Sequence, residues 1–79
     1  MIVTAEISYY PLTEDYVSRV LAFVERLRLR GDMTIATNAM STHITGRYDL
    51  VMELITEEFG EALADEDAVL VMKVAKAIR

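Results

Sequence analysis

The first part of the chain alternates between two kinds of position. From Ile2 to Tyr10, one set of side chains is apolar and the other is mostly polar. Such period-two alternation is typical of a strand with one buried face. The predicted inward set is Val3, Ala5, Ile7 and Tyr9, and the predicted outward set is Thr4, Glu6, Ser8 and Tyr10. Because Pro11 has no backbone N–H, we expect the strand to stop near Tyr10.

A helical pattern follows between Glu14 and Arg30. Its apolar residues recur at three- and four-residue spacing, which predicts an amphipathic helix. The stripe consists of Val17, Val20, Leu21, Val24 and Leu27, flanked by Tyr16 and Phe23. We expect Thr13 to cap the first turn, with Glu14 and Asp15 beside its positive dipole end. Gly31 can end the helix in a left-handed conformation, and three arginines place positive charge at the negative end. They are Arg26, Arg28 and Arg30.

Two short extended segments and a second helix make up the middle of the chain. Met33–Ala39 and Met40–Thr45 are expected to pair as a hairpin, with the polar Asn38 near the turn. Gly46 is expected to end the second segment. A second helical stripe follows, formed by Val51, Leu54, Ile55, Phe59, Ala62 and Leu63. Gly60 weakens that helix by about 1 kcal/mol relative to alanine, so we expect a kink or an early end.

A last strand is predicted from Ala68 to Ile78. Its two alternating sets are Leu70, Met72 and Val74 on one face, and Val69, Val71 and Lys73 on the other. The order strand, helix, strand, strand, helix, strand matches the ferredoxin-like βαββαβ arrangement. We therefore expect one α+β domain over residues 1–79, a four-stranded antiparallel sheet with two helices on one face. The other face stays bare, which favours a homo-oligomer, a dimer or tetramer, formed through sheet faces or edges.

Composition narrows the possible functions. Thirteen acidic residues outnumber eight basic ones, and the net charge of −5 would repel the phosphates of a nucleic acid. The chain has no cysteine, which removes disulfides and thiolate chemistry and fits a reducing compartment. No apolar run approaches the ~20 residues of a membrane span. We expect a soluble cytoplasmic protein that binds neither nucleic acid nor membranes.

Recognisable catalytic and metal-binding motifs are missing. His43 is the only histidine, and there is no cysteine or second histidine with which it could hold a transition metal. The serines lack the surroundings of a nucleophile elbow, and the three glycines are too far apart for a phosphate loop. The acidic run 65–67 lacks the ligand spacing of a calcium loop. We therefore predict no catalytic residue, metal or cofactor, and interpret His43 as a solvent-facing strand residue.

Small polar side chains cluster instead on the predicted hairpin. They are Thr37, Asn38, Ser41, Thr42 and Thr45, with Ser8 on the neighbouring first strand. Fixed donors and acceptors of this kind suit a flat ring with hydrogen-bonding edges, although threonine is also simply a good strand residue. Met40 stands beside the cluster and can supply a polarizable pocket wall.

Two stretches resemble the thiamine-binding YkoF-like family. They are "AEISYYPL", Ala5 to Leu12, and "NAMSTHITGRYDLVMELI", Asn38 to Ile55. Members typically show Tyr-Pro-Leu between strand and helix, and later Met-Ser-Thr-x-Ile-x-Gly running into a helix. The closing "KVAKAIR", Lys73 to Arg79, resembles the last strand of that family. The resemblance implies a ferredoxin-like oligomer that binds thiamine, or its hydroxymethylpyrimidine half, without transforming it.

The resemblance also implies ligand-binding residues. The family pattern falls on Ser8, Tyr10, Met40, Ser41, Thr42 and Gly46, with Asn38 just ahead of it. By this resemblance Ser8, Asn38 and Thr42 would hydrogen-bond a pyrimidine, and Tyr10 and Met40 would flank its ring.

Some family members carry an acidic residue directly after the motif glycine. This chain has Arg47 there, a cation that disfavours a nearby thiazolium, although Glu6 could restore a negative partner if it faces the ligand. Two alternatives stay open. One is a small oligomeric enzyme of the isomerase or monooxygenase type that uses His43, and the other is a structural or regulatory oligomerisation domain.

Overall fold

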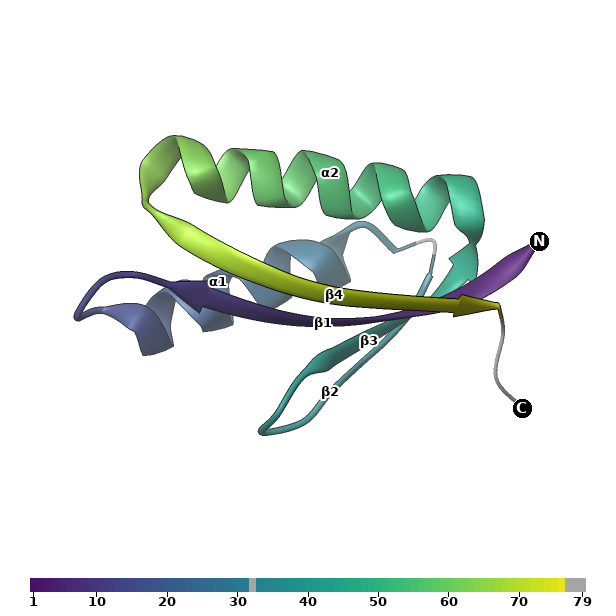
Figure 1. The fold of residues 1–79 in the computed structure, drawn as a ribbon, viewed down its shortest axis with the longest axis horizontal. Helices are drawn as coiled ribbons and strands as arrows, with labels where there is room; N and C mark the ends of the chain where they lie inside the picture. Colours follow the sequence, from purple (N-terminus) through teal and green to yellow (C-terminus); the bar gives the residue numbers. More distant parts are fainter. Residues whose placement is uncertain (32, 77–79) are drawn as a thin grey trace.

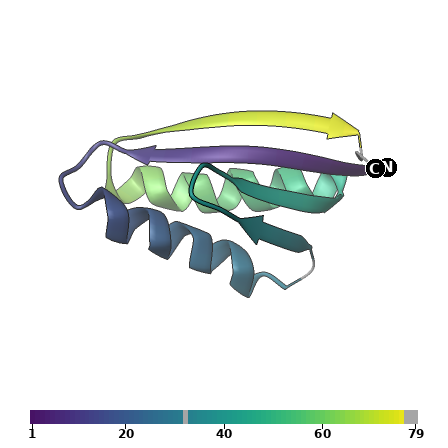
Figure 2. The same cartoon turned by 90° about the horizontal axis from the view of Figure 1, so that it is seen from below.

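The computed structural model describes residues 1–31 and 33–76 and shows a sheet layer against a helix layer (Figure 1). The elements are β1 (Ile2–Pro11), α1 (Tyr16–Leu29), β2 (Thr34–Thr37), β3 (Thr42–Arg47), α2 (Tyr48–Asp65) and β4 (Ala68–Lys76). The strands form an antiparallel sheet in the order β2-β3-β1-β4, and both helices lie on one face of it (Figure 2). This arrangement confirms the predicted ferredoxin-like α+β fold. Neither helix of the described range is long and apolar enough to cross a membrane.

The alternation of β1 sets the two faces of the sheet. Its predicted inward residues, Val3, Ala5, Ile7 and Tyr9, are buried under the helices. Directly opposite residues of an antiparallel pair share a face. Glu6 lies opposite both His43 of β3 and Lys73 of β4, so these three residues share the bare face. The set Val69, Val71 and Lys73, predicted to share one face of β4, also lies on the bare face, since Val71 is opposite Ser8.

The core lies between the sheet and the two helices. Its largest fully buried side chains are Phe23, Ile7, Leu27, Ile44, Leu54 and Val51. The ring of Phe23 stacks on that of Tyr9 with 4.3 Å between their centroids. Arg26 Nε and Arg30 Nη1 lie 3.0 and 3.1 Å from the carboxylate of Glu58. These pairs tie the end of α1 to α2, so two of the arginines predicted to have a structural use do have one.

The buried face of α1 differs from the prediction. The helix buries Phe23 and Leu27, whereas Val17 and Leu21 of the predicted stripe are 57% and 64% exposed. The first turns of α1 extend past the turn of the β2–β3 hairpin, so little sheet lies beneath them (Figure 2). An apolar stripe longer than the sheet under it leaves its first residues uncovered.

The start of α1 also differs from the prediction, whereas its end does not. The helix begins at Tyr16, and its N-cap residue Asp15 makes no side-chain cap hydrogen bond. Capping by Thr13 with an acidic first turn is therefore wrong, because the chain still turns irregularly from Leu12 to Asp15. Gly31 has a φ of 77°, and this left-handed conformation follows the end of α1 as predicted.

In the second half of the chain, the predicted ends of one strand and one helix are wrong by a few residues. β3 continues through Gly46 to Arg47, because both residues still pair with β1. α2 runs through Gly60 instead of ending there, since buried side chains before and after the glycine hold the helix on the sheet. The predicted end of β4 at Ile78 lies outside the described residues.

Two glycines offer a matched test of packing. A Cβ added at Gly46 would lie 2.6 Å from Cγ of Met33, so Gly46→Ala forces that side chain to move. We expect this substitution to lower the free energy of unfolding by about 1–3 kcal/mol. An added Cβ at Gly60 meets nothing within 4 Å, and Gly60→Ala should raise the same free energy by about 0.5–1 kcal/mol. Urea unfolding followed by circular dichroism measures both, and effects of the same sign would contradict this view of the two sites.

Candidate functional site

β1 extends further than its neighbour β3, and the difference opens a notch in the sheet. β1 pairs with β3 only as far as Ile7, which lies opposite Thr42. It pairs with β4 as far as Pro11. Residues 8–11 therefore have a neighbouring strand on one side only. The turn of the β2–β3 hairpin and the start of α1 close the other sides of the notch (Figure 2).

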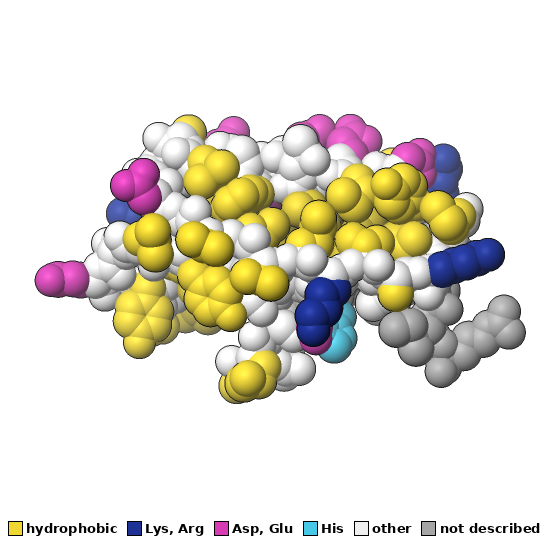
Figure 3. All heavy atoms as spheres, in the orientation of Figure 1, with side chains coloured by type: hydrophobic (Ala, Val, Ile, Leu, Met, Phe, Trp, Pro, Cys, Tyr) yellow, Lys and Arg dark blue, Asp and Glu magenta, His cyan; other side chains and the backbone are white. Residues whose placement is uncertain are grey.

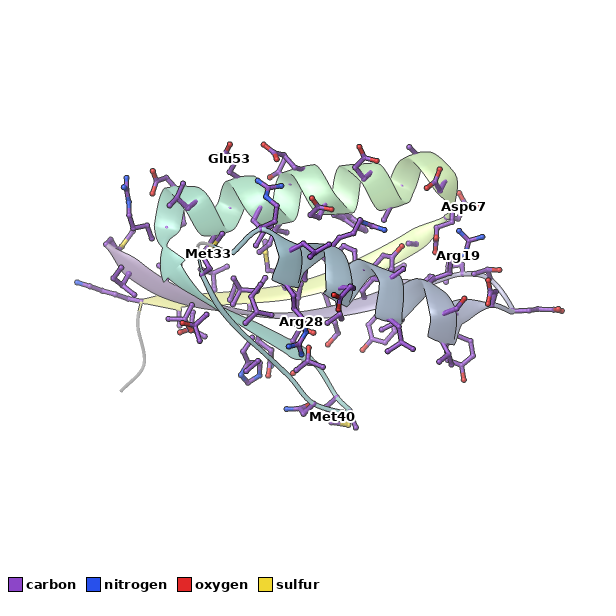
Figure 4. All side chains as sticks on the ribbon, turned by 180° about the vertical axis from the view of Figure 1, so that it is seen from behind. Arg19, Arg28, Met33, Met40, Glu53 and Asp67 are labelled. Carbon is purple, nitrogen blue, oxygen red and sulfur yellow. The ribbon has the colours of Figure 1, made fainter. Side chains whose placement is uncertain are left out.

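Asn38 shapes the turn of the hairpin. Its side-chain oxygen accepts hydrogen bonds from the backbone N–H groups of Met40 and Ser41 at 2.7 and 3.0 Å. The backbone N–H of Asn38 donates to the Ser41 carbonyl at 3.1 Å. Such local bonds are typical of a turn-forming asparagine, and they confirm the predicted hairpin with its turn over residues 38–41. Met40 projects at the tip and is 83% exposed (Figure 4).

A cavity of about 370 Å³ lies in the notch. It is lined by all six predicted ligand-binding residues, which are Ser8, Tyr10, Asn38, Met40, Ser41 and Thr42. Small-molecule sites typically have volumes of roughly 300–1,000 Å³. The structure thus gathers residues from two remote segments around a space large enough for a single ring system.

The wall opposite the hairpin comes from α1 and was not predicted. Its residues are Tyr16, Val17, Val20, Leu21, Phe23 and Val24. Their helical spacing predicts packing against the sheet, but only Phe23 of this set is fully buried. The signal that could have revealed the wall is the width of the apolar stripe, which exceeds what one helix face needs for packing on a sheet.

Two threonine hydroxyls meet at the buried side of the cavity. Oγ1 of Thr37 and Oγ1 of Thr42 are 2.6 Å apart, and Thr42 is only 6% exposed. One hydroxyl donates to the other, which leaves one proton and several lone pairs for a ligand. Asn38 can offer only its NH2 group, because its oxygen is engaged in the turn. The polar groups available to a ligand therefore include both donors and acceptors.

The lining of the cavity carries no charged side chain within the described part of the chain. Tyr9, which also lines it, stays neutral near pH 7, because burial and then the Glu66 carboxylate raise the pKa of its phenol. Arg47 lies at the opposite end of β3, where it is paired with Asp49 at 2.9 Å. Arg47 therefore does not line the cavity, and its effect on a thiazolium stays a prediction.

A polar cluster lies beside the cavity on the bare sheet face. Glu6 Oε2 is 3.0 Å from His43 Nε2 and 3.2 Å from Ser41 Oγ, and Lys73 Nζ is 3.8 Å from Glu6 Oε1. The bond from His43, and then that from Ser41, stabilises the carboxylate and lowers the pKa of Glu6 below its usual 4.5. Figure 3 shows the histidine, in cyan, beside a dark blue cation. Glu6 and His43 do not line the cavity, and they touch it only through Ser41.

This cluster does not have the geometry of a catalytic triad. In a triad the acid and the nucleophile bond opposite nitrogens of the imidazole. Here Glu6 and Ser41 both approach Nε2 of His43, at 3.0 and 3.2 Å. Among the residues described, no three His, Asp or Glu side chains come together as a metal site.

Several solved structures share the fold of this chain. A hypothetical protein from Methanocaldococcus jannascii has a TM-score of 0.83 and 28% identity, over 98% of this chain and 81% of that chain. A Thermotoga maritima protein provisionally assigned to thiamine biosynthesis or salvage has a TM-score of 0.88 and 18% identity, over 98% of this chain and 85% of that chain. A domain of unknown function, DUF77, from Bacillus cereus has a TM-score of 0.81 and 20% identity, over 98% of this chain and 77% of that chain.

No protein-family model and no curated protein matches the chain. The resemblance predicted from the sequence is confirmed as structural similarity to this group, which includes the Thermotoga maritima protein and a DUF77 domain.

Proposed function

We propose that the chain is a YkoF-like protein whose cavity binds hydroxymethylpyrimidine, or thiamine through its pyrimidine half, without transforming it. The proposal depends chiefly on one observation, the convergence of an apolar wall from α1 and small polar groups from the hairpin at the notch. A flat heterocycle needs both apolar contacts for its faces and fixed donors and acceptors for its edge. The sequence resemblance and the provisional assignment of the Thermotoga maritima neighbour support the same ligand class.

In the proposed complex the side chains have two roles. Tyr10 and Met40 flank the faces of the ring, while Ser8, Asn38 and Thr42 hydrogen-bond to its edge. The hydroxyl of Ser8 is available for this, because its bond to the Met40 carbonyl is long, at 3.4 Å. Met40 is flexible and exposed, so it can move onto a bound ring.

The uncharged lining favours the neutral pyrimidine over charged derivatives. A phosphate in the cavity would lose water without gaining a cation, and burying an unpaired charge is costly. The Glu6 carboxylate lies behind Ser41, so a thiazolium in the cavity would not contact it directly. We therefore propose that affinity decreases from hydroxymethylpyrimidine to thiamine to thiamine phosphate.

Isothermal titration calorimetry with these three compounds tests the proposal. We expect saturable heat from hydroxymethylpyrimidine and the weakest binding from thiamine phosphate. The absence of heat from both hydroxymethylpyrimidine and thiamine at millimolar concentration would refute the proposed function. Tightest binding of the phosphate would refute the role of the neutral lining.

An enzyme that uses His43 is the second candidate function, and the position of His43 outside the cavity argues against it. We expect His43→Ala to change the affinity for hydroxymethylpyrimidine by no more than about twofold, as for most surface substitutions. The same variant would lose all turnover in an enzyme with His43 as its acid or base. Calorimetry on the variant, with mass spectrometry of the ligand after long incubation, separates the two candidates. A consumed ligand would contradict non-catalytic binding.

We also propose that a second copy of the chain covers the bare sheet face. Tyr10, Val69 and Val71 lie on this face and are 52%, 47% and 49% exposed. Apolar side chains gather along the side where β4 lies, in yellow in Figure 3. Within the described residues β4 is an edge strand, and edges of this kind are usually covered or paired. A symmetric dimer or tetramer would hide both features.

Val71→Glu tests this interface. A buried, unpaired carboxylate within this interface should dissociate the oligomer, so we expect the variant to sediment as a monomer. Thr56→Glu adds the same charge on an exposed position of α2 and should leave the oligomer intact. Sedimentation velocity at tens of micromolar measures both. A wild-type protein that is monomeric at this concentration would contradict the proposal.

A further inference from the structure

The main chain of β1 has an unpaired segment at the cavity. Pairing with β3 stops at Ile7, while pairing with β4 continues to Pro11. The hairpin turns away over residues 38–41 just where Met40 would come opposite Tyr9 in the continued register. Peptide groups of β1 that point toward the missing part of β3 therefore face the notch.

Two hydrogen bonds at the ends of β1 show which peptide groups these are. Along an antiparallel strand, successive residues direct their N–H and C=O groups to alternate sides. The Leu12 N–H donates to the Asp67 carbonyl at 2.8 Å on the β4 side, and the Met1 carbonyl accepts from the Tyr48 N–H at 3.0 Å on the β3 side. Even-numbered residues of β1 thus point toward β4 and odd-numbered residues toward β3.

Tyr9 is therefore the residue of β1 that points both peptide groups into the notch. The ladder with β4 uses the peptide groups of the even-numbered residues. Among the described residues, neither the N–H nor the C=O of Tyr9 therefore has a hydrogen-bond partner. Pro11 points the same way but has no N–H to donate. Buried or half-buried peptide groups are nearly always paired in native proteins, so an open pair at a cavity is a place for a ligand.

We infer that the peptide groups of Tyr9 recognise the ligand, its N–H donating to a ring nitrogen and its C=O accepting from an adjacent amino group. This inference depends on the proposed function and specifies the edge of the ring that the site recognises. One residue supplies a donor and an acceptor side by side, which matches an aminopyrimidine edge. An extended peptide is a poorer fit, because strand addition needs a row of paired residues and Pro11 ends the donors here.

Nuclear magnetic resonance of the ¹⁵N-labelled protein tests the inference at the residue concerned. In the free protein, the Tyr9 amide should exchange with deuterated solvent faster than those of Ile7 and Tyr10, which are paired in the sheet. Saturation with hydroxymethylpyrimidine should move the Tyr9 amide resonance downfield and slow its exchange by at least about tenfold. An analogue with methyl in place of the amino group should bind about tenfold more weakly.

The outcomes separate this inference from the proposed function. If calorimetry shows binding but the Tyr9 amide neither shifts nor gains protection, the inference is wrong and the proposed function stands. Slow exchange of the Tyr9 amide in the free protein would also overturn the inference, since it would show a partner within the chain. If neither hydroxymethylpyrimidine nor thiamine binds, the proposed function fails and this inference fails with it.

Discussion

Thr42→Val is expected to weaken the binding of hydroxymethylpyrimidine by about tenfold, the worth of roughly one net hydrogen bond. Valine keeps the shape of the side chain and removes the hydroxyl at the buried side of the cavity, where Thr42 is 6% exposed. The ligand loses a hydrogen bond. Thr37 also loses the hydroxyl 2.6 Å from its own, so it must turn to the ligand or stay unpaired. Isothermal titration calorimetry measures the change.

Thr34→Val is the matched control for this prediction. Thr34 belongs to the same hairpin but lies opposite Thr45, on the bare face and away from the cavity. Its variant should bind with wild-type affinity. An equal loss in both variants, or wild-type affinity in Thr42→Val, would contradict a direct role for the Thr42 hydroxyl. Thermal unfolding of each variant separates lost affinity from lost structure.

Phe23→Ala should have the largest effect on stability, lowering the free energy of unfolding by about 3–5 kcal/mol. Phe23 is 1% exposed, and its ring stacks on Tyr9 while the Arg26 guanidinium lies 5.8 Å from the ring centre. The truncation leaves a void that the sheet cannot close, because Tyr9 is fixed in the central strand. Small domains have only about 5–15 kcal/mol of stability, so the variant should be partly unfolded at 37 °C.

Leu21→Ala is the matched control in the same helix. Leu21 is 64% exposed and lines the cavity, so its truncation should change the free energy of unfolding by less than about 1 kcal/mol. The substitution should instead lower the affinity for the ligand, because it removes part of the apolar wall. Urea unfolding and calorimetry together measure the pair. A Leu21 variant that is as destabilised as the Phe23 variant would contradict the observed register of α1.

The sheet could be predicted from the sequence because strand alternation is a local property. The two faces of β1 and of β4 follow from period two, and Asn38 marks the hairpin turn through its own side chain. The pairing order then follows from the βαββαβ sequence of elements. Exact ends were less predictable, since Gly46 and Gly60 continue their elements where packing outweighs the intrinsic preference of glycine.

The buried face of α1 could not be predicted, because periodicity identifies apolar residues but not what lies opposite them. Val17 and Leu21 have the spacing of core residues as much as Phe23 and Leu27 do. Which pair is covered depends on how far the sheet extends, and that depends on the lengths of β1 and β3. These strands are remote in the sequence, and nothing in α1 itself encodes their difference.

The candidate site combines residues that alternation assigns to opposite faces of the sheet. Ser8 and Tyr10 belong to the bare face, whereas Thr42 lies opposite Ile7 on the helix side. A ligand on an unbroken sheet could not contact both. The notch removes this conflict, because a ring placed where β3 is missing can reach side chains from either face. The sequence pointed to the residues, and the notch that unites them became visible only in three dimensions.

A crystal structure of the protein with hydroxymethylpyrimidine is the most direct test of the central claim. We predict the ring in the notch, between Tyr10 and Met40, with the Thr42 hydroxyl and the Tyr9 peptide within about 3 Å of its polar edge. A ring bound on the bare sheet face would contradict this prediction. So would an empty notch in crystals soaked with the ligand well above its dissociation constant.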